Sequence, residues 1–305
     1  MTNPLVSVIV PNYNHARYLE QRLDSVFNQT YQNFEVIILD DKSTDNSLEV
    51  IQRYKDNPHL SQIVVNEQNT GSPFKQWDKG INLAKGELIW IAESDDYNEL
   101  TFLEELITEW RKHKNVVVAF SNYVPFWDDE YVFYKERRNQ CFEGKNFIKY
   151  RMARGCSIRN ASGVVFLKDT YGRIEKDFIK FRSAGDYLFW VTVIKYGDVL
   201  KINKNLTYWR QTSTSVTGTL ERKGITAFED KQVFDYIERY YHLNRWQKKM
   251  AFASKLMQFD RFKYDTDEIR QKIYTLWDRK NHTWRPSASM LRLIGILERH
   301  FNILV

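Results

Sequence analysis

Short apolar runs alternate with helical patterns over the first 120 residues, and this alternation constrains the fold more than any other feature of the chain. Each run has the length and composition of a buried strand, and most of the segments between runs carry apolar residues at helical spacing. Strands alternating with helices predict an α/β fold, a mostly parallel sheet covered by helices on both faces. The runs expected to be strands are 5–10, 34–39, 63–65, 87–92 and 116–120.

The remaining residues follow two other patterns. Residues 121–220 are less regular and rich in aromatic residues and arginine, with a strand expected at 163–167 and a helix at 186–196. From about residue 225 the pattern is helical and mostly polar. We therefore predict an α/β domain over residues 1–220, made of halves 1–120 and 121–220, and a helical extension over residues 221–305.

Composition narrows the class of protein. The chain is 43% hydrophobic and 28% charged, which is ordinary for a globular protein and excludes wholesale disorder. Its two cysteines are too few for a disulfide framework or a zinc site and fit a reducing compartment. We see no secretory leader and no run long enough to span a bilayer, so we expect a cytoplasmic protein.

The net charge of +6 is unevenly distributed. Residues 221–305 carry 17 Lys and Arg against 11 Asp and Glu, whereas residues 1–220 carry 28 of each kind. The helical extension is therefore basic and the rest of the chain is balanced.

Unusual polar residues follow three of the predicted strands. They are Pro11 to Asn14 after the first, Asp40 and Asp41 after the second, and Glu93 to Asp96 after the fourth. In an open α/β sheet, ligands bind beyond the carboxyl ends of the strands. These loops therefore converge on one predicted site.

Carboxylates in such a site suit a divalent cation. Asp95 and Asp96 offer the hard oxygen ligands that magnesium and manganese prefer, and the phosphates of a bound ligand can supply the remaining ligands. The alternative is that Ser94 or Asp95 only caps the next helix. Asp40 and Asp41 can likewise bind a base or ribose, or can begin a turn before a helix capped by Ser43 or Thr44.

The order of the motifs resembles the family 2 glycosyltransferases over roughly residues 5–215. The motifs are Val8-Ile9-Val10-Pro11-Asn12-Tyr13-Asn14, Asp40-Asp41-Lys42-Ser43-Thr44-Asp45, Asn69-Thr70-Gly71, and Ala84-Lys85-Gly86-Glu87 leading into Glu93-Ser94-Asp95-Asp96. The resemblance implies a GT-A fold, with the nucleotide bound by residues 1–120, and a sugar transfer of the kind used in bacterial polysaccharide and cell-envelope biosynthesis. It implies a nucleotide-sugar donor, first of all a uridine diphosphate sugar.

The resemblance also implies roles for individual residues. Pro11 and Tyr13 line the base pocket, and Asp41 recognises the base, usually uracil. Asp95 and Asp96 hold the metal, manganese or magnesium, and the diphosphate.

Some positions depart from the family pattern. Lys42 stands where glycine is more frequent, and Glu93 stands where Asp is frequent, with a side chain that still reaches a ribose hydroxyl. The family's Arg-Asn pair is absent, so the cation near the diphosphate would be Lys75 or Lys79.

A catalytic base must come from the second half of the α/β domain. In an inverting transfer, a carboxylate takes the proton of the acceptor hydroxyl as that hydroxyl attacks the anomeric carbon. The family's Glu-Asp motif corresponds here to Gly185-Asp186, which leaves Asp186 as the candidate. The alternative for Asp186 is a helix N-cap.

Arg210 lies in a segment, 208–215, that resembles the family's closing segment, in which a loop folds over the diphosphate. A guanidinium can bind phosphate in a bidentate manner, so we expect Arg210 to contact the donor. The alternative is an ordinary surface arginine.

The acceptor is expected to be a glycan or a lipid-linked sugar at the inner face of the membrane. The basic extension, with the apolar residues Leu291, Ile294, Leu297 and Phe301, would then give peripheral membrane contact. A solvated basic face is the alternative. Nucleic acid is not expected as a partner, because no recognition motif accompanies the charge.

Two other functions stay open. A sugar nucleotidyltransferase shares the sheet, the base pocket and the metal, but normally carries a glycine-rich phosphate loop near its N-terminus. A catalytically inactive glycan-binding or scaffold protein of the same fold is compatible with the substitutions at Lys42, Glu93 and Gly185. A dehydrogenase is excluded by the missing Gly-x-Gly-x-x-Gly turn.

Overall fold

The computed structural model describes residues 3–128, 130–212, 216–281, 286 and 290. The chain divides into two compact units, and the first comprises residues 1–141, 160–179 and 196–212. The second comprises residues 142–159, 180–195 and 213–305. This division differs from the predicted boundary at residue 220, because three segments of the predicted α/β domain, 142–159, 180–195 and 213–220, belong to the same unit as the helical extension.

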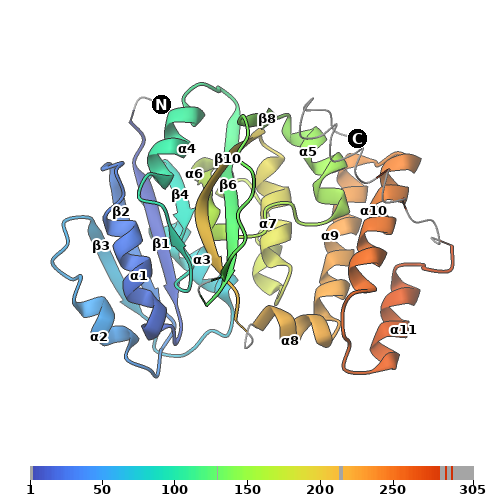
Figure 1. Ribbon diagram of the computed structural model, residues 1–305, viewed down its shortest axis with the longest axis horizontal. Helices are drawn as coiled ribbons and strands as arrows, with labels where there is room; N and C mark the ends of the chain where they lie inside the picture. The colour runs from blue at the N-terminus through green and yellow to red at the C-terminus, as the bar shows by residue number, and fades with distance from the viewer. Residues whose placement is uncertain (1–2, 129, 213–215, 282–285, 287–289, 291–305) are drawn as a thin grey trace. The chain divides into compact units, whose positions relative to one another are not determined.

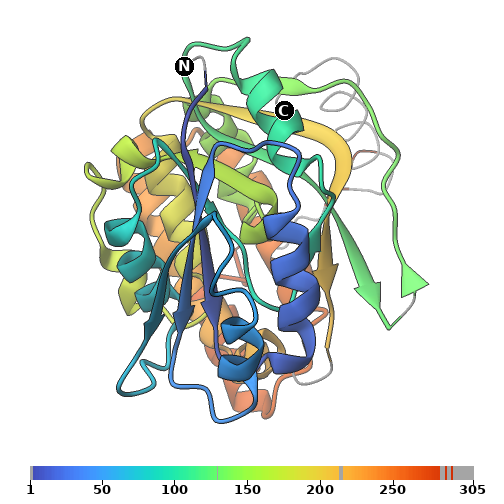
Figure 2. The same ribbon diagram turned by 90° about the vertical axis from the view of Figure 1, so that its left-hand side faces the viewer.

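The first unit is built on a ten-stranded sheet with the order β3-β2-β1-β4-β9-β6-β10-β5, to which β7 and β8 are attached (Figures 1 and 2). The strands are β1 (Val6–Asn12), β2 (Phe34–Asp40), β3 (Leu60–Val65), β4 (Leu88–Ile91), β5 (Tyr97–Asn98), β6 (Val116–Trp127), β7 (Glu130–Tyr131), β8 (Gln140–Phe142), β9 (Val164–Leu167) and β10 (Asp198–Arg210). Strands β1 to β4 are mutually parallel, β6 and β10 are parallel to each other, and β9 and β5 are antiparallel to their neighbours. The predicted α/β class and mostly parallel sheet are confirmed.

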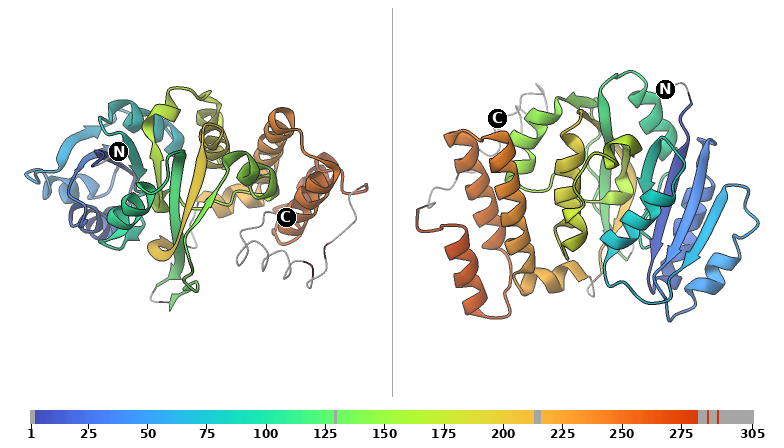
Figure 3. Two further views of the ribbon diagram at one scale, coloured as in Figure 1. Left: turned by 90° about the horizontal axis from the view of Figure 1, so that it is seen from above. Right: turned by 180° about the vertical axis from the view of Figure 1, so that it is seen from behind.

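Helices cover both faces of this sheet (Figure 3). They are α1 (Ala16–Phe27), α2 (Ser47–Gln52), α3 (Pro73–Leu83), α4 (Phe102–Trp110) and the short α6 (Lys168–Tyr171), with 3₁₀ turns at Ala161–Gly163 and Asp177–Lys180. The apolar stripes of α1, α2 and α4 pack in one core with alternate residues of β1 and β2. Helix α3 packs on the other face, where a Cβ on Gly80 would come within 2.4 Å of Ile9 Cγ2, so glycine is required for this close approach.

The second unit is helical. It contains α5 (Gly144–Tyr150), a 3₁₀ turn (Met152–Arg154), α7 (Gly185–Ile194), α8 (Val216–Arg222), α9 (Ile225–Tyr241), α10 (Arg245–Phe259) and α11 (Asp267–Leu276). The fully buried ring of Trp277 packs against Phe234 of α9 and Phe259 of α10. A buried ion pair, Lys255 to Asp230 at 2.6 Å, joins α10 to α9.

Candidate functional site

The carboxyl ends of β1 and β2 are joined by a hydrogen bond between buried side chains. Asn12 and Asp40 lie opposite each other in the parallel register, and Asn12 Nδ2 donates to Asp40 Oδ2 at 2.8 Å. The other oxygen, Asp40 Oδ1, accepts from the backbone N–H of Ser43 at 2.8 Å. Asp40 is fully buried. It therefore shapes the edge of the sheet, and its contact with a donor stays a prediction.

Asp41 organises the loop that follows β3. Its carboxylate accepts from Asn66 Nδ2 at 2.7 Å, from Gln76 Nε2 at 2.9 Å, and from both the backbone N–H and the hydroxyl of Thr70 at 2.9 and 2.8 Å. The predicted donor-site cation, Lys75, donates from Nζ to the carbonyl oxygen of Thr70 at 3.3 Å. The structure thus brings Asp41, Lys75 and the Asn69-Thr70-Gly71 motif together. Asn66 and Gln76 were missed from the sequence because neither belongs to a motif.

Pro11 and Tyr13 stand at the same edge of the sheet. Pro11 is buried within β1, whereas the Tyr13 side chain is 45% exposed. An exposed ring beside the Asp41 loops is suited to stacking on a base.

The backbone explains the family's preference for glycine next to Asp41. Lys42 has a φ of 65°, in the left-handed region that glycine adopts without strain. The chain keeps this conformation with a lysine.

The capping alternatives considered for these loops are wrong. Helix α2 has Asn46 as its N-cap residue, not Ser43 or Thr44. The acidic loop, residues 93–96, is followed by β5, and the next helix is capped at Thr101. Capping therefore does not account for Asp41, Asp95 or Asp96.

Within the acidic loop, the Asp96 carboxylate accepts hydrogen bonds from residues distant in the sequence. It accepts from Asn160 Nδ2 at 2.8 Å, from Ser162 Oγ at 2.7 Å and from the backbone N–H of Arg210 at 2.9 Å. The side chain is buried, and burial raises the pKa of Asp96 to about 6. Its hydrogen-bonding capacity is largely used by the protein.

Asp95 has a different environment. It is half-buried, and in the part of the chain that the structure describes no other residue donates a hydrogen bond to its carboxylate. Burial raises the pKa of this carboxyl group. Asp95 is therefore the member of the acidic loop whose oxygens are available to a ligand.

Two basic side chains surround the acidic loop. Arg210 Nε donates to the carbonyl oxygen of Asp95 at 2.8 Å, and its guanidinium lies 4.3 Å from the Tyr18 ring centroid. Arg22 is fully buried and donates from Nε to the carbonyl oxygen of Glu93 at 2.9 Å. The positive charge of Arg22 opposes the effect of burial on the pKa of Asp96. Arg22 was missed from the sequence because it stands among the apolar residues of a helix.

Glu93 begins the acidic loop beside an indole. Its Oε1 accepts from Trp77 Nε1 at 2.8 Å. Burial first, and then the negative charge of Asp95, raise the pKa of Glu93 to about 8. The carboxyl group is therefore mostly protonated at neutral pH and can both donate and accept a hydrogen bond.

The acidic loop has the donor set of a metal site that is completed by a ligand. The described residues contain no group of three or more His, Cys, Asp or Glu side chains arranged to hold a metal ion. A site that relies on one protein carboxylate and on oxygens of a bound diphosphate needs no such cluster, and Asp95 fits that description.

In the second unit, Asp186 occupies the first turn of α7. The N-cap residue is Ala184, so the capping alternative for Asp186 is wrong. Asp186 Oδ1 accepts from the backbone N–H of Tyr187 at 2.8 Å. The backbone N–H groups of residues 182, 183 and 184 all donate to the Glu229 carboxylate, each at 2.8 Å. Burial first, and then the charges of Asp230 and Glu229, raise the pKa of Asp186 to about 7.

Some predicted features lie outside the described residues. They are residues 213–215 of the segment after Arg210, and Leu291, Ile294, Leu297 and Phe301 of the basic extension. The helices that the structure describes include none that combines the length and the apolar character needed to cross a bilayer.

Comparison with known proteins gives a consistent result. Residues 7–167 match the family model described as glycosyl transferase family 2. The glycosyltransferase GlyG of Streptococcus pneumoniae is 30% identical over 224 residues, covering 70% of this chain and 73% of that protein. A putative teichuronic acid biosynthesis glycosyltransferase, TuaG of Bacillus subtilis, is 27% identical, with 71% and 84% covered.

Solved structures share the fold. S. aureus TarS (residues 1–349) superposes with a TM-score of 0.67 at 18% identity, over 90% of this chain and 80% of that one. Its complex with UDP-GlcNAc gives a TM-score of 0.59 at 18% identity, over 91% and 89%. The mannosyltransferase PcManGT of Pyrobaculum calidifontis, with GDP-Man and Mn²⁺, gives 0.57 at 15% identity, over 97% and 80%.

Proposed function

Because the chain belongs to glycosyltransferase family 2 and has its GT-A fold, we propose that it transfers a sugar from a uridine diphosphate sugar to a hydroxyl of a glycan or lipid-linked acceptor, with inversion at the anomeric carbon. The observation that carries the proposal is the placement, at one loop, of the available Asp95 carboxylate near the Arg210 guanidinium, which donates to the carbonyl oxygen of Asp95. A carboxylate and a guanidinium together suit a metal-bound diphosphate.

The donor nucleotide would lie over the ends of β1 and β2. Tyr13 would stack on the base, while Pro11 and the loop held by Asp41 would form the rest of the pocket. Support for uridine comes from TarS, which has been solved with UDP and with UDP-GlcNAc. A protonated Glu93 would bind a ribose hydroxyl, because its raised pKa leaves it both a donor and an acceptor.

The diphosphate would lie at the acidic loop. Asp95 would bind magnesium or manganese, and Asp96 would support the loop through its three hydrogen bonds. When bound, the metal neutralises charge on the departing nucleoside diphosphate. Arg210 and Lys75 would add positive charge there.

Asp186 would act as the general base. A carboxyl group with a pKa of about 7 is substantially ionised at neutral pH and is a stronger base than an ordinary aspartate. One of its oxygens, Oδ1, accepts from the backbone N–H of Tyr187 at 2.8 Å, while Glu229 accepts from the backbone N–H groups of residues 182, 183 and 184.

UDP release from a panel of UDP-sugars tests this proposal, with and without acceptor. We expect turnover by the wild type, its loss by at least 100-fold in Asp186→Asn, and unchanged UDP affinity in that variant. Asp235→Asn, a change on α9 at a half-exposed carboxylate, is the control. Full activity in Asp186→Asn would contradict the assignment of the base.

The same assay separates the rival functions. An inactive glycan-binding protein would release no UDP from any donor. A nucleotidyltransferase would form a nucleotide sugar and pyrophosphate from UTP and a sugar phosphate.

We also propose that residues 221–305 contact the inner face of the membrane peripherally, because this segment carries the excess positive charge of the chain. Co-sedimentation with phosphatidylglycerol vesicles should fall when salt is raised. Equal binding to neutral phosphatidylcholine vesicles would contradict an electrostatic contact.

A further inference from the structure

Five aromatic side chains form a continuous cluster. Four of them lie on β5, β6, β7 and β10, and the fifth lies two residues after the end of β7. We call this cluster the aromatic platform; its members are Tyr97, Phe126, Tyr131, Phe133 and Tyr208. The rings of Tyr97 and Tyr208 stack with centroids 4.4 Å apart, and Tyr131 stacks on Phe126 at 5.2 Å. Phe133 extends the cluster, with its centroid 6.0 Å from that of Tyr131.

The outer part of the platform faces solvent. The Phe133 side chain is 60% exposed and that of Tyr131 is 38% exposed, whereas Phe126 is buried beneath them. Figure 2 shows the β6–β7 hairpin projecting from the end of the sheet. Exposed ring clusters of this kind mark binding surfaces more often than single exposed apolar residues do.

The inner end of the platform meets the acidic loop. Tyr97 directly follows Asp96 in the chain, and the Arg210 guanidinium lies 4.5 Å from the Phe126 ring centroid. In the strand order, β4 separates β1 and β2 from β6, β10 and β5. The platform therefore lies on the opposite side of the acidic loop from the proposed base pocket.

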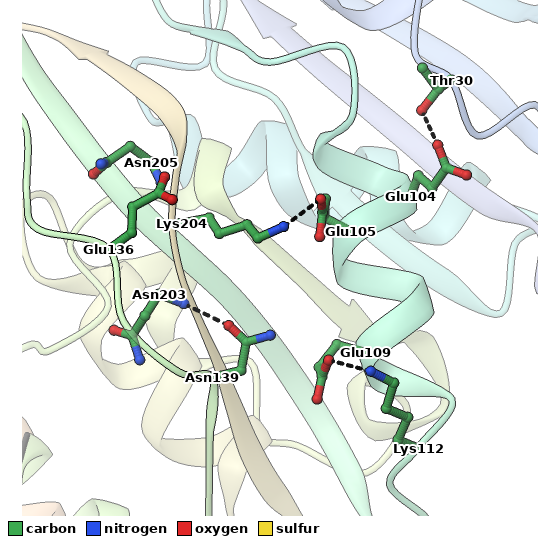
Figure 4. A network of polar contacts seen from close by, with 10 residues as sticks. All are labelled: Thr30, Glu104, Glu105, Glu109, Lys112, Glu136, Asn139, Asn203, Lys204 and Asn205. Atoms are coloured by element: carbon green, nitrogen blue, oxygen red, sulfur yellow. Dashed lines mark hydrogen bonds and ion pairs between the residues drawn. The ribbon is translucent and has the colours of Figure 1, made fainter. Parts of the chain in front are cut away.

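The segment after the platform is held firmly in place. Asn205, at an irregularity in β10, donates from Nδ2 to the carbonyl oxygen of Tyr134 at 2.7 Å, and its backbone N–H donates to Glu136 Oε1 at 3.1 Å. Nearby, the backbone N–H of Asn203 donates to Asn139 Oδ1 at 3.1 Å (Figure 4). A surface fixed in advance loses little conformational entropy when it binds a ligand.

The chemistry of the platform fits a sugar chain. The C–H groups on one face of a pyranose ring carry partial positive charge and pack on the negative face of an aromatic ring. The hydroxyls of Tyr97 and Tyr131, 3.3 Å apart, stand beside the rings as hydrogen-bonding groups. A membrane surface fits less well, because Asp128 and Glu130 at the hairpin tip would be repelled by anionic lipid.

We propose that the aromatic platform binds the acceptor glycan, with sugar rings of the acceptor stacked on Tyr131 and Phe133. This inference rests on the proposed function, since it names the acceptor surface of the same site. Binding here would direct the growing chain toward the acidic loop, where the donor sugar is released.

Glycan binding to the UDP- and manganese-loaded protein tests the proposal. The probes are cello-, malto- and chito-oligosaccharides and an array of bacterial polysaccharide fragments, read by saturation-transfer NMR and by array fluorescence. We expect at least one glycan to bind the wild type, and Phe133→Ala and Tyr131→Ala to weaken its binding at least 10-fold. Val132→Ala is the matched control, because Val132 is 49% exposed on the same segment and does not belong to the platform.

The outcomes are distinguishable. Retained UDP affinity and donor hydrolysis in Phe133→Ala, together with lost glycan binding, support the platform. Equal glycan affinity in Phe133→Ala and the wild type would overturn it. A wild type that binds no glycan would also overturn it, and so would binding to phosphatidylglycerol vesicles that depends on Phe133. Failure of the wild type to bind UDP or hydrolyse any donor would instead overturn the proposed function.

Discussion

The carboxylate of Asp96 accepts a hydrogen bond from the backbone N–H of Arg210, which lies 114 positions further along the chain. The contact fixes the acidic loop to β10, and the same arginine donates from Nε to the carbonyl oxygen of Asp95. The two adjacent aspartates therefore have different tasks: Asp96 holds the loop, and Asp95 presents its carboxylate.

The two aspartates should differ when each is replaced by asparagine. Asp96→Asn places an NH₂ group opposite hydrogen-bond donors and should lower the free energy of unfolding by about 2 kcal/mol. Asp95→Asn should change it by less than about 0.5 kcal/mol, because no other described residue donates to that side chain. Urea unfolding measures both values, and equal losses in the two variants would contradict the division of tasks.

Lys42 should be replaceable by glycine with a gain in stability. Its φ of 65° is strained for a residue with a Cβ, so Lys42→Gly should raise the free energy of unfolding by about 0.5–1 kcal/mol, a gain reduced by the greater freedom of glycine in the unfolded chain. Lys42→Ala keeps the strain and serves as the control. A melting temperature of Lys42→Gly no higher than that of Lys42→Ala would show that the backbone relaxes at no cost.

Activity should depend on pH through Asp186. A general base acts in its ionised form, so kcat/KM should rise as pH increases through about 7, the raised pKa of Asp186, and then level off. Initial rates between pH 5 and 9 at saturating metal measure this profile. A profile that is flat from pH 5 to 8 would exclude a base with this pKa.

Glu229 should act as a positioning residue for Asp186. It receives the three backbone N–H groups before α7, so Glu229→Ala should lower kcat by about 10-fold or more while leaving the KM for the donor nearly unchanged. Its negative charge also raises the pKa of Asp186, so the acid limb of the pH profile should move to lower pH in this variant. Glu229→Gln keeps one acceptor oxygen and should recover part of the rate.

Asp235→Ala is the control for Glu229, because that carboxylate is also on α9 but forms a half-exposed pair with Lys231. A rate loss in Glu229→Ala without movement of the pH profile would mean that Glu229 only stabilises the fold.

The architecture of the first 120 residues could be predicted because the positions of apolar residues along the chain indicate which side chains are buried. The runs at 5–10 and 34–39 are apolar apart from Ser7 and Glu35, whose side chains hydrogen-bond to each other, and the structure places them in fully buried parallel strands. The same pattern located the carboxyl ends of β2 and β4, and therefore the positions of Asp41 and of the acidic loop.

The second half was harder to predict for physical reasons. Strand β10 spans 13 residues, but its register against β6 shifts at three places, which breaks the period-two pattern. The partners of Asp96 come from residues 160, 162 and 210, and local sequence does not encode such distant contacts. The predicted strand at 163–167 and helix at 186–196 are nevertheless present with small changes in their ends.

Isothermal titration calorimetry of UDP binding to the wild type and to Asp95→Asn, with and without manganese, measures whether Asp95 holds a metal that binds the nucleotide. Manganese should strengthen UDP binding to the wild type at least 10-fold, whereas Asp95→Asn should bind UDP with the same affinity whether manganese is present or absent. A metal effect that persists undiminished in Asp95→Asn, or a wild-type protein that does not bind UDP, would contradict this role of Asp95.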